Sequence, residues 1–258
     1  MERFVRQFVL PMITTKTWRD ICEIGASRGE STDCLLTLPD VAVTVVDPCL
    51  DLDLKARYAN DVRVQVWKGN SLDVLPVLNS SYDCILIDGD HNWYTVYNEL
   101  RHITERELLR RGGMVFLHDV EWPYGRRDMY YQPDTIPPEY RHGYAQKGIV
   151  RGCSGLSDDS QFNSDFYNAV EEGGSRNGVL TAIEDFLCRY QGEYRFFRIR
   201  GQFGLGVIHY RDNRSKDSAV TLFVLHAMVH NLITWPQRIA KTHLPSVYSL
   251  LKVALRRA

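Results

Sequence analysis

The sequence predicts an α/β fold: a doubly wound, mostly parallel sheet of seven strands that ends in an antiparallel hairpin, followed by a helical tail. Short β-branched, apolar runs alternate with helical patterns from residue 20 to about residue 120, which is typical of a parallel sheet. Two later apolar runs are joined only by Gly201–Gly204, a link too short for a parallel crossover. These two observations define the order of the elements.

The first half of the chain supplies five strands. Most of these runs are nearly continuous in apolar character, as expected of parallel strands that are buried on both faces. The segments between them are long enough for crossover helices, such as one at Tyr94–Arg110. The strands are expected at Asp20–Ile24, Val41–Val46, Val62–Trp67, Cys84–Ile87 and Met114–Leu117.

The second half begins with an irregular stretch. Glu121–Gly155 is rich in Pro, Gly, Arg and Tyr and has no clear period, so we expect a substrate loop or lid at residues 121–160. A helical pattern follows at Gly178–Tyr190. The two last strands are expected at Tyr194–Arg200 and Leu205–Tyr210, where the short link favours a hairpin.

These patterns divide the chain into three parts. An N-terminal helix is expected at residues 1–19, the α/β domain at 20–210 and a helical C-terminal extension at 211–258. The extension either packs on the outer helices of the sheet or forms an interface, which would make the protein a homo-oligomer.

Composition narrows the class of protein. A formal net charge of −1 gives no general attraction to nucleic acid. The six cysteines are scattered without a C-x-x-C pair, which suits a reducing compartment and argues against a zinc ribbon. The longest apolar stretch, Ala219–Ile233, is interrupted by polar residues and too short to span a bilayer. We therefore expect a cytoplasmic protein with no transmembrane segment, which acts on a small molecule and not on nucleic acid.

A glycine-containing turn follows the first expected strand. Its residues, Glu23-Ile24-Gly25-Ala26-Ser27-Arg28-Gly29, let the backbone approach a ligand closely just before a helix. The spacing is G-x-x-x-G and not the G-x-G-x-x-G of dinucleotide-binding proteins. About 20 residues later, Asp47 ends the second strand, where a carboxylate either binds a ribose or closes a turn. Asn70 and Ser71 end the third strand, where they either meet an adenine edge or cap a helix.

Titratable side chains follow the fourth and fifth strands. Asp88, Asp90 and His91 come after the fourth, and His118 and Asp119 after the fifth. The carboxyl ends of neighbouring parallel strands converge on one crevice, so we expect these groups to lie together. Either imidazole could accept a proton near neutral pH. His118 is the favoured base, with Asp119 orienting it or the acceptor, and His91 is either a second candidate base or a helix-start residue.

The loop after His118-Asp119 carries aromatic and cationic side chains. Aromatic faces suit stacking on sugars or rings, and guanidinium groups suit carboxylate or phosphate. The alternative is a structural loop whose arginines pair with nearby acids such as Asp128 and Glu139. The expected substrate contacts are Trp122, Tyr124, Arg126, Arg127 and Tyr130.

Four segments in order, CEIGASRGES, VVDP, IDGDHNWYTVYNEL and GGMVFLHDV, carry a family resemblance over roughly residues 20–210. The chain resembles class I S-adenosylmethionine-dependent methyltransferases, in the group of macrolide and deoxysugar O-methyltransferases and cephalosporin-hydroxylase-like proteins. The resemblance implies methyl transfer to a hydroxyl of a sugar or of a glycosylated natural product. It also implies a cofactor site: Glu23, Gly25 and Gly29 around the methionine part, Asp47 at the ribose, Asn70 and Ser71 near the adenine, with Asp88 beside them.

The same resemblance raises the question of a metal. Some relatives bind Mg²⁺ through the first Asp of the fourth-strand motif and acids that end the fifth strand. Asp88 and Asp119 match two of these positions, whereas His118 stands where an acid is common. Imidazole suits a hard cation less well than carboxylate, so Mg²⁺ is a candidate cofactor only if the enzyme is metal-dependent.

Two other classes stay open. A nicotinamide-dependent oxidoreductase would share the α/β sheet, although the missing G-x-G-x-x-G and the terminal hairpin argue against it. A non-catalytic, methyltransferase-like partner subunit would keep the fold and act through residues 211–258.

Overall fold

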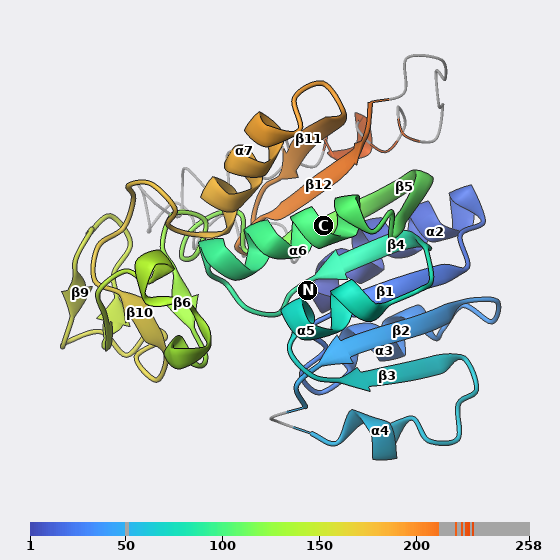
Figure 1. Cartoon of the computed structure of the whole chain (residues 1–258), viewed down its shortest axis with the longest axis horizontal. Helices are drawn as coiled ribbons and strands as arrows, with labels where there is room; N and C mark the ends of the chain where they lie inside the picture. The colour runs from blue at the N-terminus through green and yellow to red at the C-terminus, as the bar shows by residue number, and fades with distance from the viewer. Residues whose placement is uncertain (50–51, 212–219, 221–222, 224, 228, 230–258) are drawn as a thin grey trace, which may run out of the picture.

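The computed structural model describes residues 1–49, 52–211, 220, 223, 225–227 and 229, so the expected helical extension at 211–258 lies almost wholly outside the described residues. A seven-stranded sheet forms the centre of the fold, in the order β11-β12-β5-β4-β1-β2-β3 (Figure 1). The strands are β1 Asp20–Ile24, β2 Ala42–Asp47, β3 Val64–Lys68, β4 Tyr82–Ile87, β5 Leu109–His118, β11 Tyr194–Ile199 and β12 Leu205–Tyr210.

The direction of the strands confirms the predicted fold class. β1 pairs in parallel with β2 and β4, β2 with β3, and β4 with β5. β12 pairs antiparallel with both β5 and β11, so the final hairpin places the last strand between two strands that run the other way. The antiparallel hairpin of β11 and β12 is the arrangement that the short link at Gly201–Gly204 predicts.

The largest differences from the predicted boundaries lie at the end of α6 and the start of β5, whereas β2, β3, β4 and β11 differ by one or two residues at an end. The helix expected at Tyr94–Arg110 is α6, Trp93–Glu105, and it ends earlier because Glu107 takes a positive φ of 51°. β5 then begins at Leu109, well before the apolar run that predicted it. Its first part contains Arg110-Arg111-Gly112-Gly113, which hides the strand from an apolar pattern although Leu109 pairs with Tyr82 of β4.

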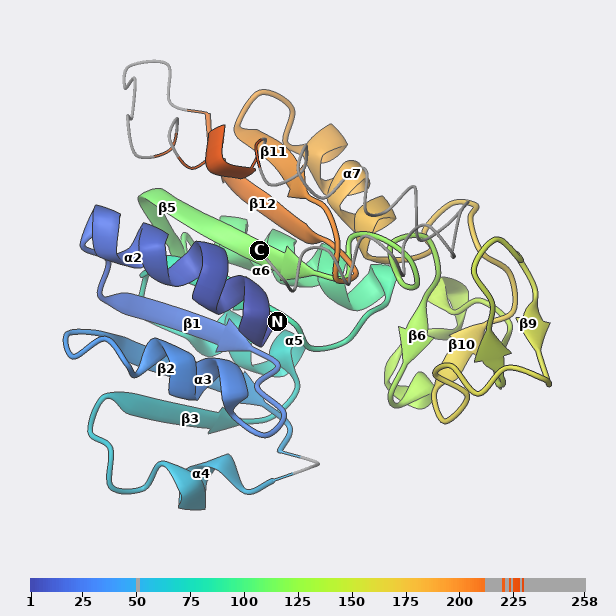
Figure 2. The same cartoon turned by 180° about the vertical axis from the view of Figure 1, so that it is seen from behind.

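Helices cover both faces of the sheet (Figures 1 and 2). On one face lie α1 Glu2–Phe4, the π-helix η1 Val5–Val9, α2 Leu10–Lys16 and α3 Glu30–Leu35. On the other lie α5 Ser71–Val74, the 3-10 turn η2 Leu75–Val77, α6 and α7 Val179–Arg189, while α4 Leu54–Arg57 lies beside β3.

Each face of the sheet has its own apolar core. Phe8 of η1 packs in one cluster with Ile21 and Phe116 of the sheet. Leu100 of α6 and Ile183 of α7 pack in the other. Successive side chains of a strand point to opposite faces, so a sheet buried on both sides needs the continuous apolar runs that the sequence shows. No helix in the described part of the chain is both long and apolar enough to cross a bilayer.

The residues between β5 and α7, 119–178, form what we call the inserted segment. It contains a three-stranded sheet, β6 Met129–Tyr130, β10 Tyr167–Ala169 and β7 Tyr144–Gln146, and a hairpin of β8 Gly148–Ile149 and β9 Leu156–Ser157. Two 3-10 turns complete it, η3 Pro133–Thr135 and η4 Pro138–Tyr140. The irregular stretch is therefore folded, and it runs beyond the expected boundary at residue 160. It stands beside the carboxyl ends of the parallel strands (Figure 1).

Buried polar groups anchor the inserted segment. Asp128 is fully buried and accepts hydrogen bonds from the backbone N–H groups of Trp93 (2.7 Å) and Gly178 (2.6 Å). Burial raises the pKa of Asp128 to about 6. Trp93 is the first residue of α6, and Gly178 is the N-cap residue of α7. The Asp128 carboxyl group therefore connects the inserted segment to the starts of two helices of the main domain.

Candidate functional site

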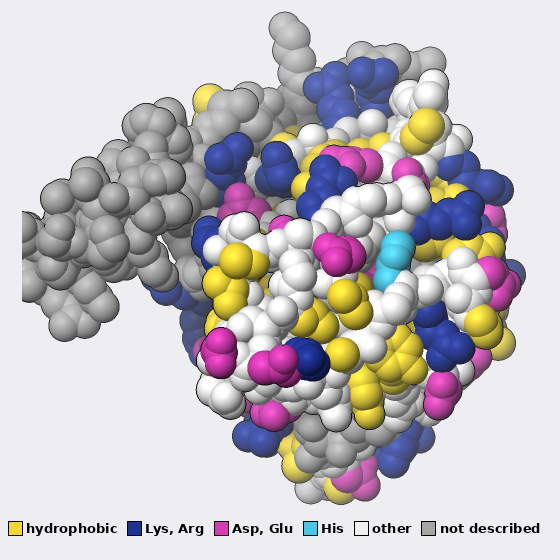
Figure 3. All heavy atoms as spheres, turned by 90° about the vertical axis from the view of Figure 1, so that its left-hand side faces the viewer, with side chains coloured by type: hydrophobic (Ala, Val, Ile, Leu, Met, Phe, Trp, Pro, Cys, Tyr) yellow, Lys and Arg dark blue, Asp and Glu magenta, His cyan; other side chains and the backbone are white. Residues whose placement is uncertain are grey.

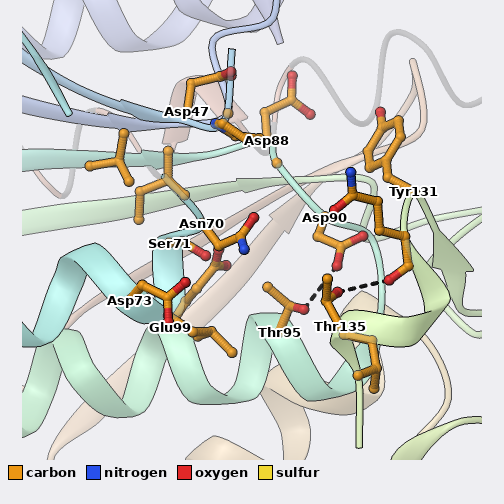
Figure 4. A pocket seen from close by; sticks show the side chains of 18 of the residues that line it. Asp47, Asn70, Ser71, Asp73, Asp88, Asp90, Thr95, Glu99, Tyr131 and Thr135 are labelled. Atoms are coloured by element: carbon orange, nitrogen blue, oxygen red, sulfur yellow. Dashed lines mark hydrogen bonds between the residues drawn. The ribbon is translucent and has the colours of Figure 1, made fainter. Parts of the chain in front are cut away.

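A cavity of about 240 Å³ opens at the carboxyl ends of β1, β2 and β4, where an open α/β sheet is expected to bind its ligand. Its walls come from four places: the strand ends, the start of α5, one face of α6 and the inserted segment (Figure 4). The lining residues are Ile24, Gly25, Ser27, Val46, Asp47, Pro48, Asn70, Ser71, Leu72, Asp73, Asp88, Gly89, Asp90, Thr95, Glu99, Tyr131, Gln132, Thr135 and Ile136.

Gly25 lets two turns meet beneath the cavity. Its φ of +81° lies in the left-handed region, and a Cβ at this position would stand 2.3 Å from the Cα of Gly89. The close approach brings the turn after β1 against the turn after β4, which carries Asp88. The glycine is therefore required for the shape of the cavity.

Glu23 and Gly29, which were expected around the methionine part of a ligand, are not among the residues that line the cavity. Glu23 is 2% exposed and accepts a hydrogen bond from the hydroxyl of Thr32 (2.5 Å). Burial raises the pKa of Glu23 to about 8. At Gly29 a Cβ would stand 2.2 Å from the hydroxyl oxygen of Tyr58. Both residues shape the turn between β1 and α3.

Asp47 lines the cavity and also holds the glycine turn in place. Its Oδ2 accepts hydrogen bonds from the backbone N–H groups of Ala26 (2.8 Å) and Ser27 (2.9 Å). Its Oδ1 accepts one from the N–H of Cys49 at 2.5 Å. The turn-closing role is thus observed, and Oδ1 keeps acceptor capacity for a ligand hydroxyl.

Asn70 and Ser71 lie at the entrance to α5 and both line the cavity. Asn70 stands at the N-cap position, yet its side chain makes no capping hydrogen bond. The capping alternative therefore does not account for Asn70, whose amide group stands on the wall of the cavity (Figure 4).

Next to this cavity, two imidazoles and two carboxylates form a connected cluster. His118 Nδ1 lies 3.0 Å from Asp88 Oδ1 and 3.2 Å from Asp119 Oδ2. Its Nε2 lies 3.2 Å from the backbone oxygen of Gln202. Both ring nitrogens of His118 thus face acceptors, which requires the imidazolium form.

The charges in this cluster support one another. Burial acts to lower the pKa of His118, but the charges and hydrogen bonds of Asp88 and Asp119 outweigh it and raise that pKa to about 10. For Asp88, burial acts to raise the pKa, but the charge of His118 outweighs burial and holds the pKa well below its usual range. The backbone nitrogen of Met1 lies 3.0 Å from Asp88 Oδ2 as a second cationic neighbour.

His91 occupies a different position in the cluster. Its Nδ1 lies 3.2 Å from Asp119 Oδ2, and its ring stacks on that of Tyr124 with centroids 5.6 Å apart. Its Nε2 makes no hydrogen bond to any residue that the structure describes. A carboxylate on one ring nitrogen fixes the tautomer and leaves the other nitrogen able to accept a proton.

Asp88, His118 and Asp119 could also hold a metal ion, because one ligand atom from each lies within 4.8 Å of the others. Their chemistry does not fit Mg²⁺ well, since Mg²⁺ prefers oxygen ligands throughout and an imidazole replaces one of them. Moreover, the nitrogen that would bind the metal is the one that donates to both carboxylates. The cluster fits an imidazolium better than it fits Mg²⁺.

The structure corrects part of the predicted substrate set. Arg127 is 1% exposed, and its guanidinium donates to the backbone oxygens of Ala169, Val170 and Ser154. Tyr130 is fully buried, and its hydroxyl donates to Asp128 (2.9 Å). These two side chains hold the inserted segment together, because their polar groups are used inside it.

The other three expected contacts lie nearer the surface or the cluster. Tyr124 is 3% exposed and packs behind His91. Arg126 makes two hydrogen bonds to Glu184, at 2.6 and 2.7 Å. Trp122 is partly exposed, with Phe162 stacked on it at 5.1 Å and the Arg151 guanidinium 4.7 Å from its ring centre. Of the five expected contacts, none lines the cavity.

Sequence reasoning missed the cavity walls supplied by α6 and by the inserted segment. Thr95 and Glu99 are four residues apart on α6, so they share the face that closes the cavity. Tyr131 and Ile136 come from the inserted segment just after β6. One signal was available: Glu99 lies within the buried face of α6, between Val96 and Leu100, where an acid is unusual.

The face of the molecule formed by the inserted segment has no single charge sign. Figure 3 shows Lys and Arg side chains interspersed with Asp and Glu and with apolar groups.

Residues 22–120 match the family model of a methyltransferase domain. They contain β1, β2, β3, β4 and β5 with the turns that form the cavity and the charged cluster. The predicted enzyme class, a methyltransferase, is thus confirmed. No curated protein matches this chain.

Among solved structures, the chain is similar in fold to a methyltransferase of Podospora anserina bound to S-adenosylhomocysteine, with 16% identity, a TM-score of 0.49, and coverage of 78% of this chain and 76% of that one. It is also similar to a putative caffeoyl-CoA O-methyltransferase from Staphylococcus aureus (17% identity, TM-score 0.47, coverage 79% and 81%). A third similar structure is the O-methyltransferase TomG from Streptomyces achromogenes (14% identity, TM-score 0.45, coverage of 78% of this chain and 77% of that one). These likenesses are too distant to bear on what the chain binds.

Proposed function

We propose that the protein is an S-adenosylmethionine-dependent O-methyltransferase that acts on a hydroxyl of a sugar or of a glycosylated natural-product small molecule. The observation that carries the proposal is the position of the cavity next to the imidazole–carboxylate cluster, at the carboxyl ends of strands in a methyltransferase domain. The first site would hold the methyl donor, and the second would receive the acceptor's proton. The sugar part of the proposal rests on the sequence resemblance.

The cavity offers the groups that an adenosyl ligand needs. Asp47 has acceptor capacity for a ribose hydroxyl, and Asn70 and Ser71 offer polar groups to a base. Asp88 presents a carboxylate at the opposite end of the same cavity, where it suits an amino group (Figure 4). Glu23 and Gly29 act on this site only by shaping the turn that carries Gly25.

His91 is the residue best placed to take the acceptor's proton. When bound, S-adenosylmethionine supplies the methyl group, which moves to the acceptor oxygen as the carbon–sulfur bond breaks and its electron pair stays on sulfur. His91 Nε2 then accepts the hydroxyl proton, and Asp119 stabilises the imidazolium that results. His118 cannot take this role in its doubly donating form, so the preference between the two histidines changes from His118 to His91.

His118 instead allows the two carboxylates of the cluster to have separate roles. Its positive charge lies between Asp88 and Asp119, so one can face the cavity while the other orients His91. Mg²⁺ has no part in the proposal, because the cluster's donor set does not favour it.

Trp122 and the exposed Tyr131 are proposed as aromatic contacts for the acceptor. Tyr131 is 46% exposed, lines the cavity, and has its ring centre 6.3 Å from that of His91. Flat aromatic faces near the proton acceptor suit a sugar ring. The inserted segment would thus supply the acceptor site.

The test is transfer of a labelled methyl group from S-adenosylmethionine to a panel of nucleotide-linked sugars, glycosylated macrolides and non-sugar phenols. We expect turnover on a sugar-containing acceptor, and a loss of about 10²-fold or more in His91→Asn with S-adenosylhomocysteine binding retained. Glu105→Gln, an exposed change at the far end of α6, is the matched control. Turnover only on phenols would overturn the sugar assignment, and near-normal turnover in His91→Asn would overturn the assigned base. Cofactor binding without turnover on any acceptor would favour the partner-subunit alternative.

A further inference from the structure

Glu99 is a buried acid whose carboxyl oxygens make no well-formed hydrogen bond to the described residues, although the Ser71 hydroxyl lies near enough to act on the group. The side chain is 0% exposed, and neither carboxyl oxygen has a hydrogen-bond partner among the described residues. Leaving a buried polar group unsatisfied costs about 1–3 kcal/mol, so such a group in a folded protein calls for an explanation. Glu99 sits on α6, in the middle of a helix face that otherwise packs apolar residues.

The unsatisfied carboxyl group lines the proposed donor cavity. Glu99 reaches it from α6, beside Ser71 and near Asn70, at the end opposite Asp88 (Figure 4). Ile24, Val46, Leu72 and Ile136 supply apolar surface to the same cavity. Apolar surface beside a few convergent polar groups is what a flat base needs, because its faces pack against the apolar walls while its edge is recognised by hydrogen bonds.

The protonation state of Glu99 defines what it can recognise. Burial raises the pKa of Glu99 to about 8 against the lowering effect of the nearby Ser71 hydroxyl, and the charge of Asp90 acts in the same direction as burial. A neutral carboxyl group offers one donor and one acceptor side by side. Adenine presents the matching pair, an amino N–H donor next to a ring-nitrogen acceptor.

We propose that Glu99, as a neutral carboxyl group, recognises the amino edge of the adenine of the bound methyl donor: its carbonyl oxygen accepts from the 6-amino group while its O–H donates to the neighbouring ring nitrogen. This inference rests on the proposed function, because it names the part of the adenosyl ligand that the α6 wall contacts. It makes Glu99 a specificity-determining residue that reads the base and takes no part in methyl transfer.

Two ligands and three variants of the full chain test the assignment by calorimetry. The ligands are S-adenosylhomocysteine and its analogue with purine in place of adenine, which lacks the 6-amino group. The variants are Glu99→Leu, Glu99→Gln and the control Glu105→Leu, which makes the same chemical change at an exposed site of the same helix. Circular dichroism checks that each variant is folded.

The wild type should bind the purine analogue at least about ten-fold more weakly than S-adenosylhomocysteine. Glu99→Leu should lose about ten-fold or more in affinity for S-adenosylhomocysteine and should no longer discriminate between the two ligands. Glu99→Gln should stay within about three-fold of the wild type, because an amide also offers one acceptor beside one donor. The control should match the wild type with both ligands.

Two results would overturn the inference while leaving the proposed function intact. One is equal affinity of the wild type for the two ligands, which needs no variant to fold. The other is a Glu99→Leu variant that binds S-adenosylhomocysteine as the wild type does or keeps its discrimination. Failure of the wild type to bind S-adenosylhomocysteine at all would instead overturn the proposed function, and the inference with it.

Discussion

Replacing Glu99 by Gln should stabilise the ligand-free protein at neutral pH. The fold raises the pKa of this acid from its ordinary value of 4.5 to about 8. At pH 7 the group is therefore neutral in the folded state but ionised in the unfolded state. The difference favours the unfolded state by about 3 kcal/mol, because each pH unit above 4.5 adds about 1.4 kcal/mol until the folded pKa is reached.

The sign of this effect makes the stability gain depend on pH. The unfolded state releases the Glu99 proton as pH rises through 4.5, so wild-type stability from this group is complete below that pH and is lost as pH rises towards 8. Gln cannot ionise, so the free energy of unfolding of Glu99→Gln should exceed that of the wild type by about 3 kcal/mol at pH 7. The two should converge near pH 4.5. Glu23, whose pKa is also raised to about 8, is present in both proteins and cancels in the comparison.

Urea unfolding followed by circular dichroism, at pH 7 and at pH 4.5 without ligand, measures the difference. Glu105→Gln serves as the control, because Glu105 is exposed and should give less than about 0.5 kcal/mol at either pH. The reasoning would be refuted by a Glu99→Gln variant that is less stable than the wild type at pH 7. A gain of equal size at both pH values would show that the carboxyl group does not change its protonation state on folding.

Three further predictions concern the turn, the inserted segment and the metal. Gly25→Ala should abolish S-adenosylhomocysteine binding in calorimetry and lower the unfolding temperature. The left-handed φ alone costs an alanine about 1–2 kcal/mol, and the new Cβ would overlap Gly89. Normal binding by this variant would contradict the close approach of the two turns. Arg127→Met should cost about 2–4 kcal/mol in urea unfolding because it removes a buried guanidinium that donates to three backbone carbonyl groups. Arg126→Ala, with a half-exposed ion pair, should cost less than about 1 kcal/mol, and equal costs would refute this distinction. Treatment with EDTA should leave methyl transfer within about two-fold of the untreated rate, and restoration of a lost rate by added Mg²⁺ would show that the charged cluster holds that ion.

The sheet could be predicted because its strands are buried on both faces. β1 and β12 are found at the residues where their apolar runs predict them, and β4 begins two residues before its predicted start. β5 was predicted too short, since Arg110 to Gly113 interrupt its apolar pattern although they continue the strand. An apolar pattern in the sequence indicates which residues are buried, so it gives no signal for the part of a strand that is exposed.

The inserted segment could not be derived in the same way. Its strands have two or three residues, which is too few to show any alternation. Its order depends on buried polar groups such as Asp128 and Arg127, and their partners are backbone groups far away in the chain. Arg126 and Arg127 are adjacent and identical in type, yet the first is half-exposed and the second is buried.

The site was predictable where it follows from strand ends. Asp47, Asn70 and Asp88 line the cavity because the carboxyl ends of parallel strands share one edge of the sheet. Glu99 was missed although it lies in the apolar face of α6, because helical periodicity alone does not show that this face closes a cavity. The roles of the two histidines depend on which atoms their ring nitrogens face, and that geometry is not encoded in their spacing.

The central claim is that the cavity binds an adenosyl ligand. Calorimetric titration of the purified protein with S-adenosylmethionine, S-adenosylhomocysteine and NADH, each with and without Mg²⁺, tests it most directly. The account predicts that both adenosyl ligands bind with micromolar affinity, which corresponds to a binding free energy of about −8 kcal/mol. It also predicts that NADH does not bind and that Mg²⁺ does not change the affinity. Absence of adenosyl binding under every condition, or binding of NADH in its place, would contradict it.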